Sequence, residues 1–201
     1  MNPSARNIRT LFVCNNTTRQ MMSQLIAYEP LMLFVEEIID YSLRQNNLLN
    51  WNPAMNLEYL RLQHADKRYF DDRIGEAIGH SCTERAAINS ALKLGFDENS
   101  WLTLDPENAR ERLIEYLGLM LNHDQVNIDL AVFQLFSFGC YVGRAAMKRR
   151  LNGLTNEVVQ ALVRTCCVHF PYEKQYVEFL TYAESYNSAH HGMHSQHDER
   201  F

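Results

Sequence analysis

The stretch that decides the fold is VNIDLAVFQLFSFGCYVGRAAM, residues 126–147. Apolar residues occupy nearly every face of a helix drawn through it, whereas the flanking segments are apolar along one stripe only. This contrast predicts a central, buried helix surrounded by amphipathic helices. The run is also close to the roughly 20 residues that a bilayer crossing demands. Because Asp129 and Arg144 interrupt it, and charged residues inside a membrane cost several kcal/mol, the sequence favours the buried helix over a membrane span.

A second strongly apolar segment, residues 156–170, follows after a short connection. A short connection makes two helices antiparallel neighbours, so the predicted core is a hairpin of two apolar helices. Thr155 is placed to cap the free amides at the start of the second helix. The hairpin should be covered by about five or six amphipathic helices, as in other bundles.

The segments before the hairpin carry helical spacing and clear stop signals. No stretch shows sustained period-two alternation, so the sequence predicts an all-α fold. Asp105 is a good N-cap and Pro106 suits the first helical position, so a helix should begin there. The other predicted features are a helix over residues 31–51 that ends before Pro53, a loop with a short helical turn over 54–68, and one or two helices over 69–94 with Gly95 as a left-handed end.

The length of 201 residues fits one domain with a core of its own. Residues 1–24 are polar and predict a flexible or short-helical leader. Residues 25–186 form the predicted helical domain, including a last aromatic helix after Pro171. Residues 187–201 are polar and His-rich, which predicts a disordered tail.

Charge disfavours a nucleic-acid partner, because the net charge is −5 and basic residues are scattered. The run Lys148, Arg149 and Arg150 is the only basic cluster. It is interpreted as a solvated end of the central helix, which suits the helix dipole. A phosphate or membrane-surface site is the alternative.

Motifs for catalysis occur only as fragments, which predicts no enzymatic activity and no cofactor. The five cysteines lack CxxC spacing and point to buried thiols in a reducing compartment. Cys166 and His169 share a helical face, but their apolar neighbours indicate core. His190 and His194 are one helical turn apart and could bind a metal, although no cysteine or acid completes a site.

Four segments, in chain order, resemble the homology regions of the Bcl-2 family of apoptosis regulators, whose fold is a buried helical hairpin surrounded by amphipathic helices. FVEEIIDYSLRQNNLLNW, residues 34–51, is similar to the fourth region and is especially like the nematode cell-death inhibitor of this family. RIGEAI, residues 73–78, resembles the third region, and FSFG, residues 136–139, resembles the end of the first. Residues 170–180 occupy the place of the second region, with Tyr176 where the family has a tryptophan.

The resemblance implies a Bcl-2-like bundle with a hydrophobic groove that binds an amphipathic partner helix. Gly75 and Gly139 would be the small residues of the homology regions, which let helices approach. The alternative interpretation of each groove residue is that it only packs in the hydrophobic core. The implied groove residues are Phe70, Ile74, Ile78, Leu113, Leu117, Asn127, Leu130, Phe133 and Phe138.

Two departures from the family pattern affect the expected function. The family's Asn-Trp-Gly-Arg signature, whose arginine pairs with an acid of the partner, falls on residues 128–131 or 127–130, and neither register supplies an arginine. Loss of that pair would weaken the binding free energy of a partner by about 1.5–3 kcal/mol. In addition, Asp71 stands where a donor helix buries a leucine, which favours the inhibitory class over the pore-forming class.

The resemblance implies a non-enzymatic apoptosis regulator whose partners are pro-apoptotic amphipathic-helix proteins of the same family, or a caspase-activating adaptor. A helical scaffold or assembly subunit without groove binding is the alternative from another class, and a Bax- or Bak-like pro-apoptotic member is the alternative within the family. The expected location is cytoplasmic. A C-terminal anchor beyond this chain would place the protein on the mitochondrial outer membrane.

Overall fold

The computed structural model describes residues 30–54, 57–63, 70–123, 128–169 and 185, and every regular element in these ranges is a helix. The predicted all-α fold is therefore confirmed for the described residues. A helix over residues 30–45 comes first. It is followed by α2 (Leu57–Gln63), α3 (Asp72–Ile78), α4 (Ser81–Lys93), α5 (Glu98–Trp101), α6 (Pro106–His123), α7 (Ile128–Lys148) and α8 (Asn152–His169).

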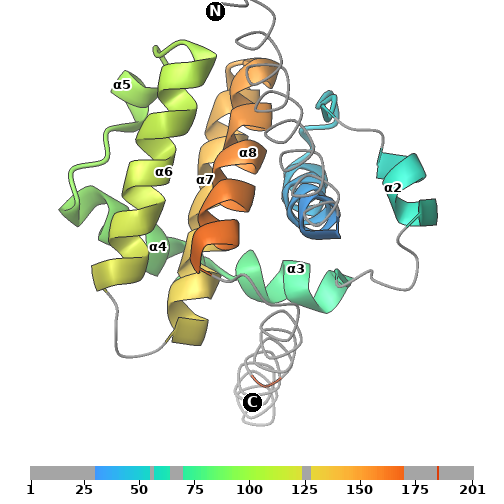
Figure 1. Cartoon of the computed structure of the whole chain (residues 1–201), viewed down its shortest axis with the longest axis horizontal. Coiled ribbons are helices and arrows are strands. Elements are labelled where there is room, and N and C mark those ends of the chain that lie inside the picture. Colours follow the sequence, from blue (N-terminus) through green and yellow to red (C-terminus); the bar gives the residue numbers. More distant parts are fainter. Residues whose placement is uncertain (1–29, 55–56, 64–69, 124–127, 170–184, 186–201) are drawn as a thin grey trace, which may run out of the picture.

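α7 is the central helix and contacts α3, α4, α6 and α8 (Figure 1). Every residue from Phe133 to Cys140 is buried, so this part of α7 has no solvent-exposed face. The helix over residues 30–45 covers a further side, where the rings of Phe34 and Phe136 meet edge to face with centroids 5.6 Å apart. Each large apolar side chain buried here contributes about 1.5–3 kcal/mol.

α8 returns antiparallel to α7, as the sequence predicts, and both belong to one hydrophobic core. α6 packs along α8 as well as α7. Two ion pairs cross the surface between α6 and α8: Arg110 Nη1 lies 3.2 Å from Glu157 Oε2, and Arg164 Nη1 lies 2.8 Å from Glu111 Oε1. The first pair is partly buried and the second is exposed. Surface pairs stabilise little, so the shared core carries most of the energy of this contact.

Three helices end in the same way, with a left-handed residue followed by an apolar one. Gly95 has φ 83°, as predicted, while Asn47 and Arg150 adopt φ 57° and 60°. In each case the next amide, that of Phe96, Leu48 or Leu151, donates to a carbonyl five residues earlier. This is the Schellman motif, which satisfies carbonyl groups left free at a helix end and seats the apolar residue against the helix.

Some predicted helix boundaries need correction. The first helix ends at residue 45 instead of 51, because the turn at Asn47 closes it earlier. α8 begins at Asn152, so Thr155 lies within the helix and does not cap it. The start of α6 is confirmed, since the Asn108 N–H donates to Asp105 Oδ1 over 3.1 Å.

Gly139 allows α7 and α8 to approach closely. A Cβ atom at this position would lie 2.6 Å from Leu162 Cδ1 and 3.1 Å from Leu162 Cγ. Gly118 on α6 is different, because a Cβ atom there would meet nothing within 4 Å. Any residue larger than glycine at position 139 would therefore have to displace Leu162.

Other predictions fall partly or wholly outside the described residues. These are the leader over residues 1–24, the aromatic helix after Pro171 and the tail over residues 187–201. The described part of the domain over residues 25–186 is helical and shares one core. Of the helices described, α7 included, none combines the length and apolar character of a membrane span.

Replacing the two glycines with alanine should give opposite results. Gly139→Ala forces Leu162 to move and should lower the free energy of unfolding by about 1–2 kcal/mol. Gly118→Ala removes backbone freedom without a clash and should raise it by about 0.5–1 kcal/mol. Urea denaturation of both variants measures the difference. A Gly139→Ala protein as stable as Gly118→Ala would contradict the close approach of the two helices.

Candidate partner-binding site

Seven of the nine predicted groove side chains are described, and all seven are buried with at most 7% of their surface exposed. They belong to the same continuous core. Asn127 lies outside the described residues, and the side chain of Leu130 is not described. The structure thus brings the seven together in the interior, and their contact with a partner helix stays a prediction that requires this layer to open. The seven are Phe70, Ile74, Ile78, Leu113, Leu117, Phe133 and Phe138.

α3 presents its apolar residues to the core and its charged residues to solvent. Ile74, Ala77 and Ile78 are buried, and Glu76 is exposed. Asp71 caps the helix, because its Oδ1 accepts the Ile74 N–H over 3.0 Å. The residue that stands in place of the family's leucine therefore starts this helix and does not fill the core.

Gly75 lets α3 lie directly against the first helix. A Cβ atom on Gly75 would lie 2.5 Å from Tyr41 Cδ1, and the whole edge of this rigid ring would have to move. On its other side Tyr41 meets the ring of Phe70, with centroids 5.8 Å apart. Any residue larger than glycine at position 75 would therefore have to displace Tyr41.

A buried arginine on α7 is the main polar feature of the interior. The Arg144 side chain is 8% exposed, and its Nη2 lies 2.6 Å from Glu84 Oε1 on α4. Its Nη1 donates to Ser42 Oγ over 2.6 Å, which ties the helix over residues 30–45 to the same charge. Sequence reasoning treated Arg144 only as an interruption of the apolar run. A lone arginine in a buried run does signal an internal acid, but the sequence does not say which one.

A hollow of about 310 Å³ adjoins this ion pair. Tyr41 and Glu76 lie at it together with Arg144 and Glu84, so the hollow carries acids as well as a base. Cys140 also lines it, and burial raises the pKa of its thiol to about 11. The thiol is therefore protonated at neutral pH and a poor nucleophile.

Aromatic rings fill the space between α4, α6 and α7. The Phe96 ring lies edge to face with Phe138 at 4.9 Å and with Tyr116 at 5.2 Å between centroids. Trp101 closes the cluster, and its Nε1 donates to the Ala109 carbonyl over 2.9 Å. A second hollow, of about 410 Å³, lies over Trp101 and Tyr116 and is rimmed by polar residues, including the acids Asp97, Glu111 and Glu115.

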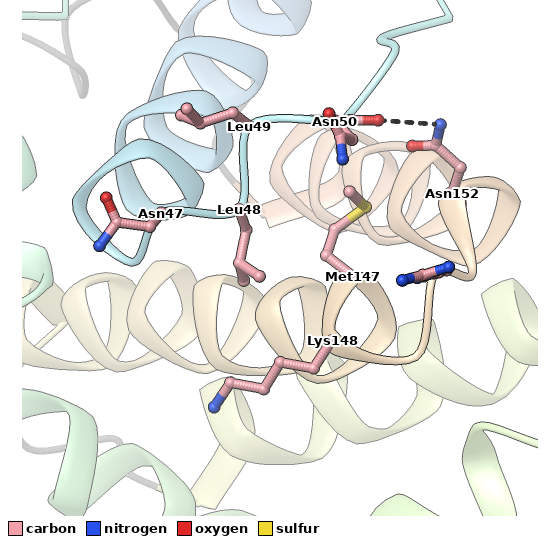
Figure 2. Close-up of a pocket in the computed structure, with 8 residues that line it drawn as sticks. Asn47, Leu48, Leu49, Asn50, Met147, Lys148 and Asn152 are labelled. Atoms are coloured by element: carbon pink, nitrogen blue, oxygen red, sulfur yellow. Dashed lines mark hydrogen bonds between the residues drawn. The ribbon is translucent and has the colours of Figure 1, made fainter.

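The third hollow, of about 500 Å³, lies where the first helix and α7 end and α8 begins (Figure 2). Apolar side chains and cations share its wall, and no acid lines it. Asn152 at the start of α8 closes one side, and its Nδ2 donates to the Asn50 carbonyl over 3.4 Å. The lining residues are Asn47, Leu48, Leu49, Asn50, Met147, Lys148, Arg150 and Asn152.

The described residues add no side chain that would complete a catalytic or metal site around Cys166. Cys166 is fully buried, and burial raises the pKa of its thiol, while the side chain of His169 is not described. No group of three or more His, Cys, Asp or Glu side chains gathers as metal ligands in the described part of the chain. His190 and His194 lie outside it.

Comparison of the chain with models of known protein families, with curated proteins and with solved structures finds no match.

The ion pair of Arg144 should make a measurable contribution to stability. Glu84→Gln keeps an acceptor oxygen but removes the negative charge, so the buried guanidinium has only neutral partners. Because Glu84 is 29% exposed, water offsets part of this loss, and the free energy of unfolding should fall by about 1–2 kcal/mol. Glu76→Gln, at an exposed acid of the same hollow, should change it by less than about 0.5 kcal/mol. Equal effects in urea denaturation would contradict a specific role for the pair.

Proposed function

We propose that the chain is a non-enzymatic apoptosis regulator of the Bcl-2 type that binds an amphipathic helix of a partner. The arrangement of helices supports this proposal. A buried hairpin of α7 and α8 is covered by α3, α4, α6 and the helix over residues 30–45. The three described segments that resemble homology regions, residues 34–51, 73–78 and 136–139, contribute side chains to this core. Gly75 and Gly139, the small residues that the resemblance singles out, both lie at close helix contacts.

One observation carries the proposal, namely that the seven described groove residues belong to one continuous hydrophobic core. Ile74 and Ile78 come from α3, Leu113 and Leu117 from α6, and Phe133 and Phe138 from α7. An amphipathic partner helix presents a row of apolar side chains at positions i, i+3 or i+4, and i+7. This row packs against the groove residues once α3 separates from α6 and α7.

The layer is closed in this structure, so binding must be coupled to opening. α3 is the natural element to move, because it has only seven residues and buries one face. Any free energy spent on opening reduces the apparent affinity, since only the open fraction of molecules can bind. Association should also be slower than for a preformed groove.

The electrostatics differ from the family pattern. Arg144 is the only arginine on α7, and it is already engaged by Glu84 and Ser42. An acid of the partner therefore lacks a free arginine on this helix, and apolar contacts must supply most of the affinity.

The inhibitory class is favoured over the pore-forming class. A helix that inserts into another member of the family must present an apolar row, and α3 carries Asp71 at the first position of that row. In this chain Asp71 is used to cap α3 and to pair with Arg73 at 2.9 Å. The proposed partners are pro-apoptotic amphipathic-helix proteins of the same family or a caspase-activating adaptor.

A helical scaffold without groove binding is the second candidate. The observation that favours it is the burial of all seven described groove residues, because a core that never opens offers nothing to a partner helix. The two candidates differ in one measurable property, which is whether any amphipathic helix binds.

A titration with fluorescent amphipathic peptides of the partner type tests the proposal. At least one peptide should bind with a Kd below about 10 μM, or about −7 kcal/mol. Hydrogen exchange should show that the α3 amides change protection on binding, because this helix must move. If no peptide reaches this affinity, the scaffold function replaces the proposal.

Two leucines on α6 provide a matched control for that titration. Leu117 is fully buried and Leu119 is 48% exposed. Leu117→Ala should weaken peptide binding by about tenfold or more, while Leu119→Ala should leave it within about twofold. Thermal unfolding of both variants shows whether each remains folded at the assay temperature. Alanine is preferred to glutamate at Leu117, because an unpaired charge in the core would unfold the protein.

A further inference from the structure

We propose that the hollow between the end of the first helix and the α7–α8 turn binds a phosphate group, held by Lys148 and Arg150. This inference does not depend on the proposed function, because the hollow lies apart from the groove residues and shares none of them. It concerns the basic run at residues 148–150. From the sequence, this run is interpreted as a solvated helix end, with a phosphate or membrane-surface site as the alternative.

The charge around this hollow differs from that of the rest of the protein. The chain carries a net charge of −5, and the other two hollows described above contain acids. Lys148 and Arg150 line this one without an acid among the lining residues. Arg149, between them, donates to Asn99 Oδ1 over 2.6 Å. The local potential is therefore positive on an acidic protein, which favours an anion at this place.

The cations here are also unpaired. Within the described residues, neither Lys148 nor Arg150 has a carboxylate within ion-pair distance. Most other described arginines do have one: Arg44, Arg61, Arg73, Arg110, Arg112, Arg144 and Arg164. An unpaired lysine and arginine keep their donors available for a ligand.

The wall of the hollow is held in place by side-chain amides. Asn152 Oδ1 accepts the Asn52 N–H over 3.2 Å, and Asn156 Oδ1 accepts the Trp51 Nε1–H over 2.9 Å. Together with the bond from Asn152 to the Asn50 carbonyl, they fasten the segment after the first helix to the first turn of α8. The position of Asn47 and of Arg150 is fixed further by the Schellman turns in which they lie.

The chemistry of the site suits phosphate better than a simple carboxylate. A phosphate group offers three acceptor oxygens and up to two negative charges. The lining residues include a planar guanidinium, an ammonium and the side-chain amides of Asn47 and Asn50, which is more donor capacity than one carboxylate uses. The N-terminus of α8, an 18-residue helix, adds a favourable partial charge, which opposes the partial negative charges where the first helix and α7 end. The net positive charge of the hollow therefore comes from Lys148 and Arg150.

The size and rim of the hollow suit a phosphate group from either of two kinds of molecule. A volume of about 500 Å³ admits a phosphate together with the small polar group that carries it. Leu49 at the rim is 69% exposed, and an exposed leucine beside cations also suits the interface of an anionic membrane. A soluble phosphate ester and a lipid headgroup therefore share this chemistry, and the experiment must separate them.

The test uses the full chain and two probes. Isothermal titration with inositol hexakisphosphate measures binding of a soluble phosphate ester. Flotation with phosphatidylcholine vesicles, with and without phosphatidylinositol 4,5-bisphosphate, measures binding of a lipid headgroup. Binding of the soluble probe supports the proposal and identifies a soluble phosphate ester as the source. Binding of only the vesicles that contain phosphatidylinositol 4,5-bisphosphate, with weaker binding by the Leu49→Ser protein, supports it and identifies a lipid headgroup. No binding of either probe at about 1 mM phosphate would overturn it.

A matched pair of double variants distinguishes a site from general charge attraction. The Lys148→Gln/Arg150→Gln protein should lose about tenfold or more in affinity. The Arg85→Gln/Lys93→Gln protein removes the same charge at two exposed residues of α4 that also lack a carboxylate partner in the described part of the chain. It should change the affinity by less than about twofold, and equal losses would overturn the proposal. Glutamine at position 150 keeps a side chain at the left-handed turn, so neither variant alters the backbone strain there.

Discussion

The structure depends on one constraint, which is that the middle of α7 has no side facing water. Residues 133–140 are all buried, so each surrounding helix must supply an apolar face or a small residue at its contact with α7. This requirement explains why α3, α4 and α6 are amphipathic. It also explains why Gly139 lies at the contact with α8, since two helices with large side chains at that point could not come so close.

The same constraint determines where polar groups on α7 can go. A guanidinium that leaves water must regain its hydrogen bonds inside the protein. Arg144 does so with one acid from α4 and one hydroxyl from the first helix, so a single side chain links three helices. A pair of this kind adds little net stability compared with a good apolar contact, but it permits only one arrangement of the helices around it.

The sequence predicts the parts of the fold that depend on local pattern. The buried helix, the all-α class, the cap at Asp105 and the left-handed Gly95 all follow from the order of residues, and the structure agrees with each. The predicted end of the first helix at residue 51 is too late, because Pro53 marks only where a helix cannot continue, whereas the chain already turns at Asn47. Thr155 is predicted as a cap because it directly precedes the apolar segment, but α8 already begins at Asn152.

The candidate site was less accessible to sequence reasoning. Apolar spacing identified the residues that share one layer, but it cannot tell an open groove from a closed core, since both bury the same face of each helix. The partner of Arg144, and the lack of an acid beside Lys148 and Arg150 in the described part of the chain, depend on which helices meet in space. Such contacts join residues far apart in the chain, and no periodicity records them.

The fastening of the segment around Asn52 to α8 has a consequence for the order of folding. The bonds from Asn52 to Asn152 and to Asn156 join residues 100 and 104 positions apart. The α7–α8 hairpin needs only a short loop closure, whereas these bonds must close a loop of about half the chain. Contacts between distant positions are entropically expensive and form late. The first helix should therefore join a hairpin that already exists, and the α7 face that it covers is the last part of the core to leave water.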